Sequence, residues 1–512
     1  MFTTEYAPAE VKPTGQQVAF LNALTGTTSN LALVARAGCG KTSTIMMGVD
    51  AIRTANPRAE VLVCAFNKAI AEEVAGKLKK AGHTDWRSVQ ASTLHGLGFG
   101  LVNYAFNRPT VDDKKVEKIV DTANGEVFTT YRPQILSLVK YAKQAGFGFF
   151  SDLSIADEAP WLALADHYDV NGFDQMEDAS DVVEAARWVY KASLAQTEVV
   201  DFDDMILFPL IKNLTVKFGK DVVFLDEAQD LSRSRQALAR KFVKRGGRMI
   251  VVGDDRQAIY GFSGADAAAL PNLIASLDAK VLPLSVTWRC PKAVVKLAQT
   301  IVRDIEAAPN APEGRVNHVK TGLPSDLRVG DAILCRNTAP LVKMAYGLIR
   351  AGKPAKVEGR AIGDGLKALA GRWKVASIDM LLRKLDDYAA REVQKAQAKG
   401  NEAKVEEVED RVGTLVEVCR ACIAAGKTTV ADVKAFIDRL FADDASGAII
   451  LATYHRSKGR EWPRVYLFEH HDRCPSKAAR KGWQIEQEQN LAYVAFTRAQ
   501  AELTFVTEEG DH

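Results

Sequence analysis

Between residues 31 and 52, a short apolar run, a loop with two glycines and a helical pattern follow one another. Leu31–Val34 predicts a buried strand, and the apolar residues spaced from Ile45 to Ile52 predict a helix. The loop between them, Ala35–Thr42, reads ARAGCGKT. A strand, a tight turn and a helix bring backbone N–H groups and the positive end of a helix dipole to one point, which favours phosphate binding. The sequence therefore predicts an α/β fold with a phosphate-binding loop.

Every residue of this loop is a candidate for nucleotide binding. Gly38 and Gly40 allow the backbone to turn its N–H groups toward phosphate oxygens. Lys41 is expected to reach the β- and γ-phosphates, and Thr42 to ligate Mg²⁺. The other members of the loop are Ala35, Arg36, Ala37 and Cys39. Ala35 stands where the GxxxxGK[ST] pattern has its first glycine, so the match to that pattern is incomplete.

A second apolar run ends in two adjacent carboxylates. Val222–Leu225 predicts a parallel strand buried on both faces, and Asp226 and Glu227 follow at its carboxyl end. Open α/β sheets bind ligands at that edge. Asp226 would hold Mg²⁺ through its water shell, and Glu227 would orient and deprotonate the water that attacks ATP. The alternative is a pair of solvated acids, and the phosphate loop upstream favours the catalytic interpretation.

Polar residues also follow other predicted strands, where the scaffold holds them facing solvent. Asn67 and His95 each follow a strand of the first sheet, and Gln257 follows Met249–Gly253. Gln257, placed beside a γ-phosphate, could sense whether that phosphate is present. Gln16 precedes the phosphate loop and could read an adenine edge with its amide. The alternative for Gln16 is a solvated glutamine at a helix start.

The composition limits the class of protein. A chain of 512 residues that is 47% hydrophobic is long enough for two to four domains. The net charge is +3, from 67 basic and 64 acidic residues, so a nucleic-acid surface would be a local patch. Seven cysteines, with Cys419 and Cys422 as a lone CxxC, favour reduced thiols in a cytoplasm over a zinc site. No apolar run reaches the ~20 residues of a membrane span, so we expect no membrane partner.

Four further segments complete an ordered set of motifs: Gly253–Asp266 (GDDRQAIYGFSGAD), Thr287–Cys290 (TWRC), Thr453–Trp462 (TYHRSKGREW) and Gln489–Ala499 (QNLAYVAFTRA). With them, the chain resembles a superfamily 1 DNA helicase of the UvrD/Rep/PcrA type. The resemblance runs through both ends and the middle of the chain, and this ordered set is far more specific than a phosphate loop alone. It implies two RecA-like P-loop motor domains, ATP and Mg²⁺ as cofactors, and single-stranded and duplex DNA as partners.

The resemblance also implies individual roles. Arg289 and Arg498 resemble two arginines that meet the transferring phosphoryl group from the second motor domain and neutralise its charge. Trp288 resembles an aromatic residue that stacks on adenine, and Glu461 a carboxylate near the ribose. The expected DNA contacts are Asn67, His95, Tyr260, Phe262 and His455. Tyr260 and Phe262 would stack on bases at ~1–3 kcal/mol per base, and the alternative for both is ordinary core packing.

Four positions depart from the pattern of the family. Arg36 stands where a glycine is usual, so its side chain must point away from the phosphates. Ser43 replaces an arginine that commonly follows GKT, which removes a cation from one face of adenine. Ser263 replaces an arginine that usually contacts DNA, and Phe66 lies one place later than the usual aromatic residue. The ATP site therefore matches the family more closely than the DNA contacts do.

We expect two motor domains, each interrupted by a mainly helical insertion. The first would comprise residues 1–98 and 200–280, with an insertion at 99–199. The second would comprise residues 281–362 and 448–512, with an insertion at 363–447 that looks cut down beside the accessory domain of the family. Because this second insertion leaves and re-enters one sheet, we expect a short linker to be able to replace it.

The predicted function is an ATP-dependent cytoplasmic enzyme that moves on single-stranded DNA and unwinds duplex, 3′ to 5′ by resemblance. Its protein partners would be repair or replication proteins. One alternative is a translocase that displaces proteins and hardly unwinds. Another is an ATP-gated single-strand-binding subunit of a larger complex, which the presence of Glu227, Arg289 and Arg498 argues against.

Overall fold

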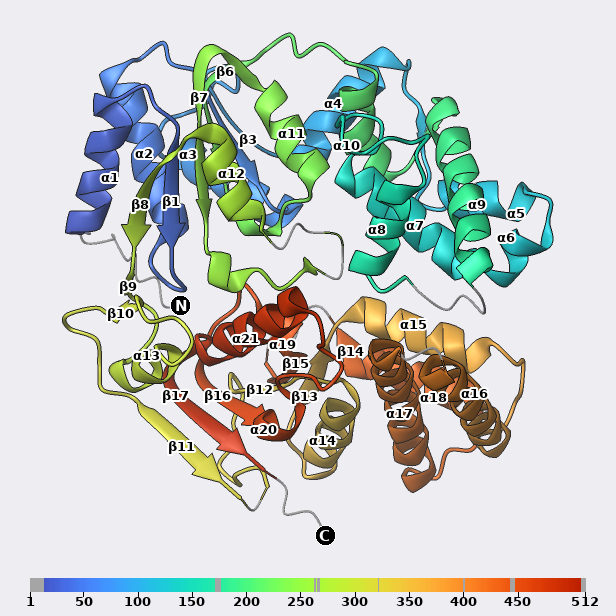
Figure 1. Cartoon of the computed structure of the whole chain (residues 1–512). Coiled ribbons are helices and arrows are strands. Elements are labelled where there is room, and N and C mark those ends of the chain that lie inside the picture. Colours follow the sequence, from blue (N-terminus) through green and yellow to red (C-terminus); the bar gives the residue numbers. More distant parts are fainter. Residues whose placement is uncertain are drawn as a thin grey trace.

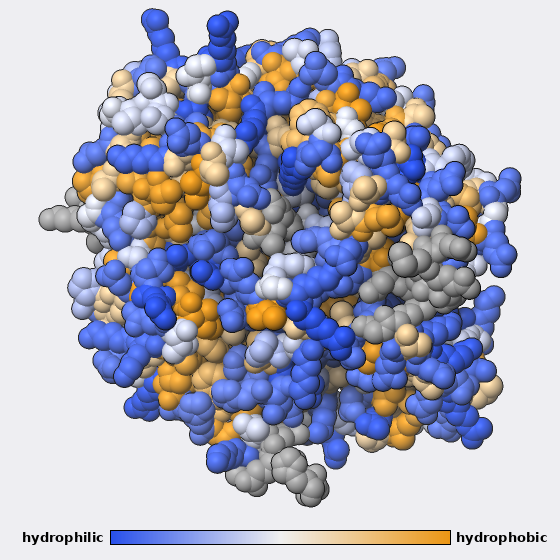
Figure 2. All heavy atoms as spheres, viewed as in Figure 1, coloured by the Kyte–Doolittle hydropathy of each residue, from blue (hydrophilic) through white to orange (hydrophobic). Residues whose placement is uncertain are grey.

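The computed structural model describes residues 13–170, 176–261, 264, 268–320, 322–398, 401–442 and 447–507. Its elements form two α/β lobes, one above the other in Figure 1, and each lobe carries a group of helices on the same side. On the face drawn in Figure 2, most surface residues are hydrophilic and the hydrophobic ones form smaller patches between them. No helix in the described ranges combines the length and the apolar composition that a membrane span needs.

The first lobe is built on a parallel six-stranded sheet with the order β3-β2-β6-β7-β1-β8. Its strands are β1 (Leu31–Ala35), β2 (Val61–Ala65), β3 (Val89–Thr93), β6 (Lys220–Leu225), β7 (Val243–Gly253) and β8 (Lys280–Leu284). Because β8 pairs with β1, the first sheet extends past residue 280, where we expected the first domain to end. β8 is a half-exposed edge strand that contains Pro283, so its sequence resembles a linker.

Helices cover both faces of this sheet, as the apolar strands require. One face packs against α1 (Gly15–Gly26), α2 (Lys41–Ala55) and α3 (Lys68–Lys80). The other packs against α4 (Leu94–Ala105), α10 (Phe202–Ile211), α11 (Arg233–Lys241) and α12 (Ala269–Leu277). The positive end of α2 lies at the phosphate loop, because this helix begins at Lys41.

The segment between β3 and β6 is mainly helical and has its own core, around the fully buried Trp161 and Tyr190. Its helices are α5 (Lys115–Thr122), α6 (Glu126–Thr130), α7 (Arg132–Ala145), α8 (Ala159–His167) and α9 (Met176–Ala195), and the short strands β4 (Thr110–Val111) and β5 (Val199–Val200) pair beside them. Buried Lys115 and Lys143 form ion pairs of 2.7 and 2.8 Å with Asp204 of α10. These pairs join the insertion to the first lobe.

The second lobe is built on a parallel seven-stranded sheet with the order β11-β17-β16-β12-β15-β13-β14. Its strands are β11 (Arg315–Val319), β12 (Ala332–Cys335), β13 (Ala355–Glu358), β14 (Phe441–Ala442), β15 (Ile449–Thr453), β16 (Trp462–Phe468) and β17 (Ala499–Val506). One face packs against α13 (Lys292–Ala298) and α21 (Gly482–Phe496), and the other against α14 (Ala339–Arg350). β14 lies inside the range 363–447, so that range contributes a short edge strand to the sheet.

The helices of the second insertion share the core of the second lobe. They are α15 (Arg360–Gly371), α16 (Ile378–Ala398), α17 (Glu402–Ala424) and α18 (Val430–Leu440). Leu381 of α16 and Leu415 of α17 belong to the same buried cluster as Ile333 of β12 and Leu341 of α14. A short linker in place of these helices would expose that cluster. Periodicity shows that a helix has an apolar face, but it does not show what covers that face.

Candidate active site

The loop between β1 and α2 is shaped to hold phosphate. Gly38 and Gly40 have φ angles of 73° and 78°, which side-chain-bearing residues rarely adopt. A Cβ added to Gly38 would lie 2.5 Å from Oγ1 of Thr287, and the N–H of Trp288 donates to the carbonyl of Gly38 at 2.9 Å. Glycine at position 38 therefore allows both the left-handed turn and the close approach of the segment that leads into the second lobe.

Lys41 and Glu227 face one another, with Nζ and Oε1 2.7 Å apart. Glu227 follows β6 with a φ of 49°, and the amide of Gln229 donates to its other carboxylate oxygen. Burial raises the pKa of Glu227, but Lys41 and Lys458 lower it by more, so that it lies below the usual range of a glutamate. Glu227 is therefore ionised at neutral pH, as a proton acceptor must be.

Asp226 is a buried carboxylate whose charge is only partly compensated. It accepts the N–H of Glu227 at 2.9 Å, and its pKa is raised by burial and then by Glu227. The cation that acts on it, Lys41, pairs with Glu227 instead. A divalent ion would stabilise the charged form of Asp226. Thr42, in the first turn of α2, supplies a hydroxyl, and these two oxygen donors fit Mg²⁺.

Gln257 lies in the short helix η2 (Asp255–Gln257) after β7. Its amide donates to Oδ2 of the buried Asp254 at 2.7 Å. From the second lobe, Nζ of Lys458 donates to the carbonyl of Gln257 at 2.6 Å and forms an ion pair with Asp230. Sequence reasoning did not single out Lys458 or Asp230, because they lie 228 positions apart in the chain.

The two predicted arginine contacts are held by protein oxygens. Arg289 forms an ion pair with Glu461, the carboxylate expected near the ribose. Arg498 is buried, and its guanidinium donates to the carbonyls of Val494 at 2.7 Å and Arg460 at 3.1 Å. Burial, and then the charge of Arg289, lowers the pKa of Arg498 to about 9. A phosphoryl group would have to replace these partners in order to bind both arginines.

The two candidates for binding adenine differ in their accessibility. Trp288 is 54% exposed beside the phosphate loop, so its ring is open to a base. Gln16 uses both ends of its amide, since Nε2 donates to Oγ of Ser285 at 2.8 Å and Oε1 accepts the Ser285 N–H at 2.9 Å. Adenine would therefore compete with Ser285 for Gln16. Gln17, which the sequence did not single out, is buried and donates to Oγ1 of Thr44 at 2.9 Å.

The side chains of the remaining loop residues lie within the protein. Ala35, Ala37 and Cys39 are buried. The guanidinium of Arg36 forms ion pairs with Asp254, Asp255 and Asp304. Arg36 can therefore contribute its backbone to the phosphate loop, while its side chain serves contacts elsewhere.

Tyr260 lies in an aromatic arrangement suited to stacking. Its ring is parallel to that of Phe66, with centroids 6.2 Å apart and planes at 8°. Nζ of Lys458 lies 4.9 Å from the centroid of the Tyr260 ring. Aromatic faces with a nearby cation are the groups that bind single-stranded bases without sequence preference. Phe262, the other residue expected to stack on bases, lies outside the described residues, as does Ser263.

The other predicted DNA contacts are an asparagine that caps a helix and two partly buried histidines. Oδ1 of Asn67 caps α3 by accepting the N–H of Ile70 at 2.9 Å. Burial, and then a nearby arginine, lowers the pKa of His95 to about 4. Burial, and then two nearby cations, lowers the pKa of His455 to about 3. Both histidines are neutral at pH 7, so they would contact DNA through hydrogen bonds and not through charge.

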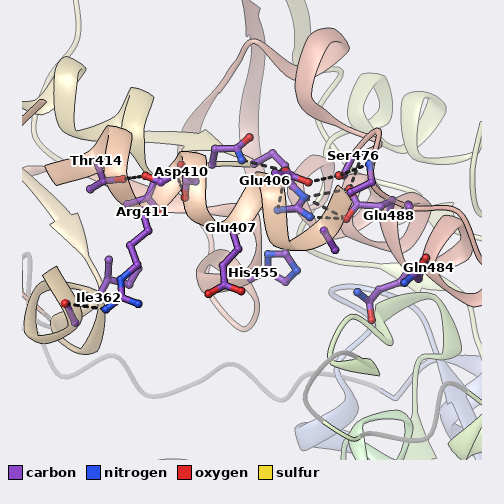
Figure 3. Close-up of a pocket in the computed structure, with 18 of the residues that line it drawn as sticks. Ile362, Glu406, Glu407, Asp410, Arg411, Thr414, His455, Ser476, Gln484 and Glu488 are labelled. Atoms are coloured by element: carbon purple, nitrogen blue, oxygen red, sulfur yellow. Dashed lines mark hydrogen bonds and ion pairs between the residues drawn. The ribbon is translucent and has the colours of Figure 1, made fainter. Parts of the chain in front are cut away.

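His455 borders a cavity of about 460 Å³ at the carboxyl edge of the second sheet. Figure 3 shows Glu406 and Asp410 of α17 on this cavity, together with Glu488 of α21. Arg336, which follows β12, donates to both carboxylate oxygens of Glu488 over 2.8 to 3.1 Å. The sequence did not indicate this cavity, because the acidic residues of α17 look like a solvated helix face.

Both lobes of the chain match models of helicase domains. The family model for the UvrD/REP helicase N-terminal domain matches residues 16–277, and that for the UvrD-like helicase C-terminal domain matches residues 374–510. The ATP-dependent DNA helicase Rep of Buchnera aphidicola subsp. Acyrthosiphon pisum is 22% identical over 74% of this chain and 56% of the relative. Rep of Escherichia coli is 24% identical over 53% of this chain and 40% of the relative. The chain spans about half the length of these relatives.

Proposed function

Because the chain belongs to the UvrD-like helicase family, we propose that it is an ATP-driven helicase that moves along single-stranded DNA and unwinds duplex, 3′ to 5′ by family resemblance. The observation that carries this proposal is a composite site between the lobes. Lys41 and Glu227 belong to the first lobe, and Arg289, which packs against Gly38 of the phosphate loop, leads into the second. Hydrolysis in such a site depends on how the lobes meet.

In the proposed reaction, Glu227 accepts the proton of the water that attacks the γ-phosphate, since its carboxylate is ionised and lies at the loop. Lys41 exchanges Glu227 for the phosphate oxygens, which frees that carboxylate for the water. Thr42 and Asp226 would hold Mg²⁺, which neutralises phosphate charge when it is bound. Arg289 and Arg498 exchange their protein partners for the phosphoryl oxygens and stabilise the charge that develops there.

The same contacts suggest how ATP would drive movement. Lys458 lies in the segment after β15 of the second lobe, and it binds Asp230 and the Gln257 carbonyl of the first lobe. It also lies over Tyr260, the proposed stacking residue. A change at Gln257 when the γ-phosphate leaves would therefore alter both the contact between the lobes and the surface that holds DNA. In this proposal, each sheet together with its helical insertion forms one motor domain.

Strand displacement on duplexes with a single-stranded tail of either polarity tests this function. We expect ATP-dependent unwinding of the substrate with a 3′ tail, and none with a non-hydrolysable ATP analogue. ATP hydrolysis and protein displacement without unwinding would indicate a translocase. Single-strand binding without hydrolysis would indicate an ATP-gated subunit. The seven cysteines are free and buried, which agrees with the proposed cytoplasmic location.

A further inference from the structure

Arg36 uses its whole guanidinium group on three carboxylates. Nη1 lies 2.9 Å from Oδ1 of Asp254 and 2.6 Å from Oδ1 of Asp255. Nε donates to both oxygens of Asp304 at 2.9 and 3.1 Å, and Nη2 donates to Oδ2 of Asp304 at 2.8 Å. Arg36 is 9% exposed. Because the guanidinium is planar and rigid and binds carboxylates on two of its edges, it fixes the relative positions of all three carboxylates.

These carboxylates belong to different parts of the molecule. Asp254 and Asp255 form the tip after β7 in the first lobe. Asp304 follows α13, and its neighbours Val302 and Ile305 are buried in the core of the second lobe. The contact between Arg36 and Asp304 is therefore a two-pronged ion pair between the phosphate loop and the second lobe.

A second set of contacts converges on Asp254. Its Oδ2 accepts the amide of Gln257 at 2.7 Å and lies 3.4 Å from the hydroxyl of Tyr493 in α21. The same hydroxyl accepts the N–H of Ala37, the next residue of the phosphate loop, at 3.0 Å. The phosphate loop, the tip that carries Gln257 and the helix that precedes Arg498 are thus joined around one buried carboxylate.

We propose that Arg36 is a positioning residue that holds the two lobes together through Asp304 and orients Gln257 through Asp254. The link depends on this side chain, since a glycine, which the resembled family usually has here, could form none of these ion pairs. It rests on the proposed ATP hydrolysis for its functional meaning, because Arg36 acts on Gln257 and on the second lobe and does not itself face the phosphates.

The ion pair of Arg36 with Asp304 is called the tether below. Asp304→Asn tests it without changing the phosphate loop, and Asp326→Asn is the matched control. Asp304 is 56% and Asp326 67% exposed in their side chains, and each pairs with an arginine in this structure. The pair of Asp326 with Arg464 joins the loop before β12 to β16, so it lies within the second lobe. The backbone N–H groups of Ala37 and Trp288 both donate across the junction of the lobes. Hydrogen exchange of these two amides therefore reports opening without any nucleotide.

We expect Asp304→Asn to accelerate exchange at Ala37 and Trp288 by about 5- to 10-fold, and Asp326→Asn to leave both rates unchanged. Single-turnover ATP hydrolysis should slow by a similar factor in Asp304→Asn, with ATP affinity within about 2-fold. Arg36→Ala should slow hydrolysis further, because Gln257 also loses its support. The double variant Arg36→Ala/Asp304→Asn should match Arg36→Ala, since the two residues act through one contact.

Unchanged exchange at Ala37 and Trp288 in Asp304→Asn would overturn the tether. Equal acceleration throughout the chain would also overturn it, because the pair would then be a general stabilising contact. Additive losses in the double variant would show that the two residues act separately. If the wild type hydrolysed no ATP, the proposed function would fail, while the exchange comparison would still decide whether Arg36 and Asp304 hold the lobes together.

Discussion

Lys458 of the second lobe and Asp230 of the first form a buried ion pair between the lobes. The same ammonium donates to the carbonyl of Gln257 at 2.6 Å and lies 4.9 Å from the ring centroid of Tyr260. One side chain thus contacts the segment after the proposed catalytic carboxylates, the proposed γ-phosphate sensor and the proposed stacking surface. Lys458 therefore connects the proposed ATP site to the proposed DNA-stacking surface.

Lys458→Gln should uncouple the two sites. The amide keeps most of the length of the side chain but leaves Asp230 without a cation, so we expect the DNA-stimulated ATPase rate to fall by about tenfold or more. The rate without DNA should fall much less. Lys458→Arg, which keeps the charge, is the control. Equal losses with and without DNA would show that Lys458 serves hydrolysis alone.

Glu227→Gln should retain ATP and Mg²⁺ binding and lower kcat by about 10² to 10⁴, because it removes the proposed proton acceptor and leaves Asp226 and Lys41 in place. Steady-state hydrolysis and equilibrium binding of a nucleotide analogue check this. Lys41→Ala should instead lose nucleotide affinity as well. A Glu227→Gln enzyme with near-normal turnover would mean that another group activates the water.

Tyr260→Ala should weaken single-strand binding by about 1 to 3 kcal/mol, because it removes the ring on which a base would stack. That ring lies parallel to Phe66 and close to the ammonium of Lys458 in the stacking arrangement proposed above. Fluorescence anisotropy with a labelled oligonucleotide measures this loss. Tyr260→Phe, which keeps the ring, should bind nearly as well as the wild type. If Tyr260→Ala bound DNA normally and was less stable to urea, the ring would be a packing residue.

Leu415→Ala should destabilise the second lobe by about 2 to 5 kcal/mol, because its side chain is fully buried in the core that α17 shares with β12 and α14. Urea unfolding followed through hydrogen exchange of the second sheet is the measurement. Ile423→Ala, on the same helix and 46% exposed, is the matched control and should cost far less. A small loss at Leu415 would restore the interpretation of a separable insertion.

His455→Gln should make the protein less sensitive to acid. The pKa of His455 is about 3 in the folded chain, against ~6.5 when unfolded. Between these values the unfolded chain binds more protons, so stability falls as the pH drops below about 6.5. The variant lacks this titration, and its melting temperature should fall less from pH 7 to pH 5 than that of the wild type. An equal fall would mean that His455 is charged in the folded protein.

Sequence reasoning places residues correctly where a local pattern determines their position. The loop around Gly38 and Lys41 and the pair Asp226–Glu227 can be predicted because a strand, a turn and a helix determine where their side chains lie. The partners of Arg36 could not be predicted, because they lie more than 200 positions away in the sequence and only the fold brings them into contact. The edge strand β8 and the shared core under α17 were missed for a related reason, since the sequence pattern of each does not show which element it packs against.

The rate of ATP hydrolysis by the wild-type chain, measured with and without single-stranded DNA, tests the central claim most directly. A composite site that connects to the proposed DNA surface through Lys458 should hydrolyse ATP slowly alone and at least about tenfold faster with DNA, which corresponds to about 1.4 kcal/mol in the activation barrier. Hydrolysis that does not respond to single-stranded DNA, or no hydrolysis in the presence of Mg²⁺ and DNA, would contradict the account.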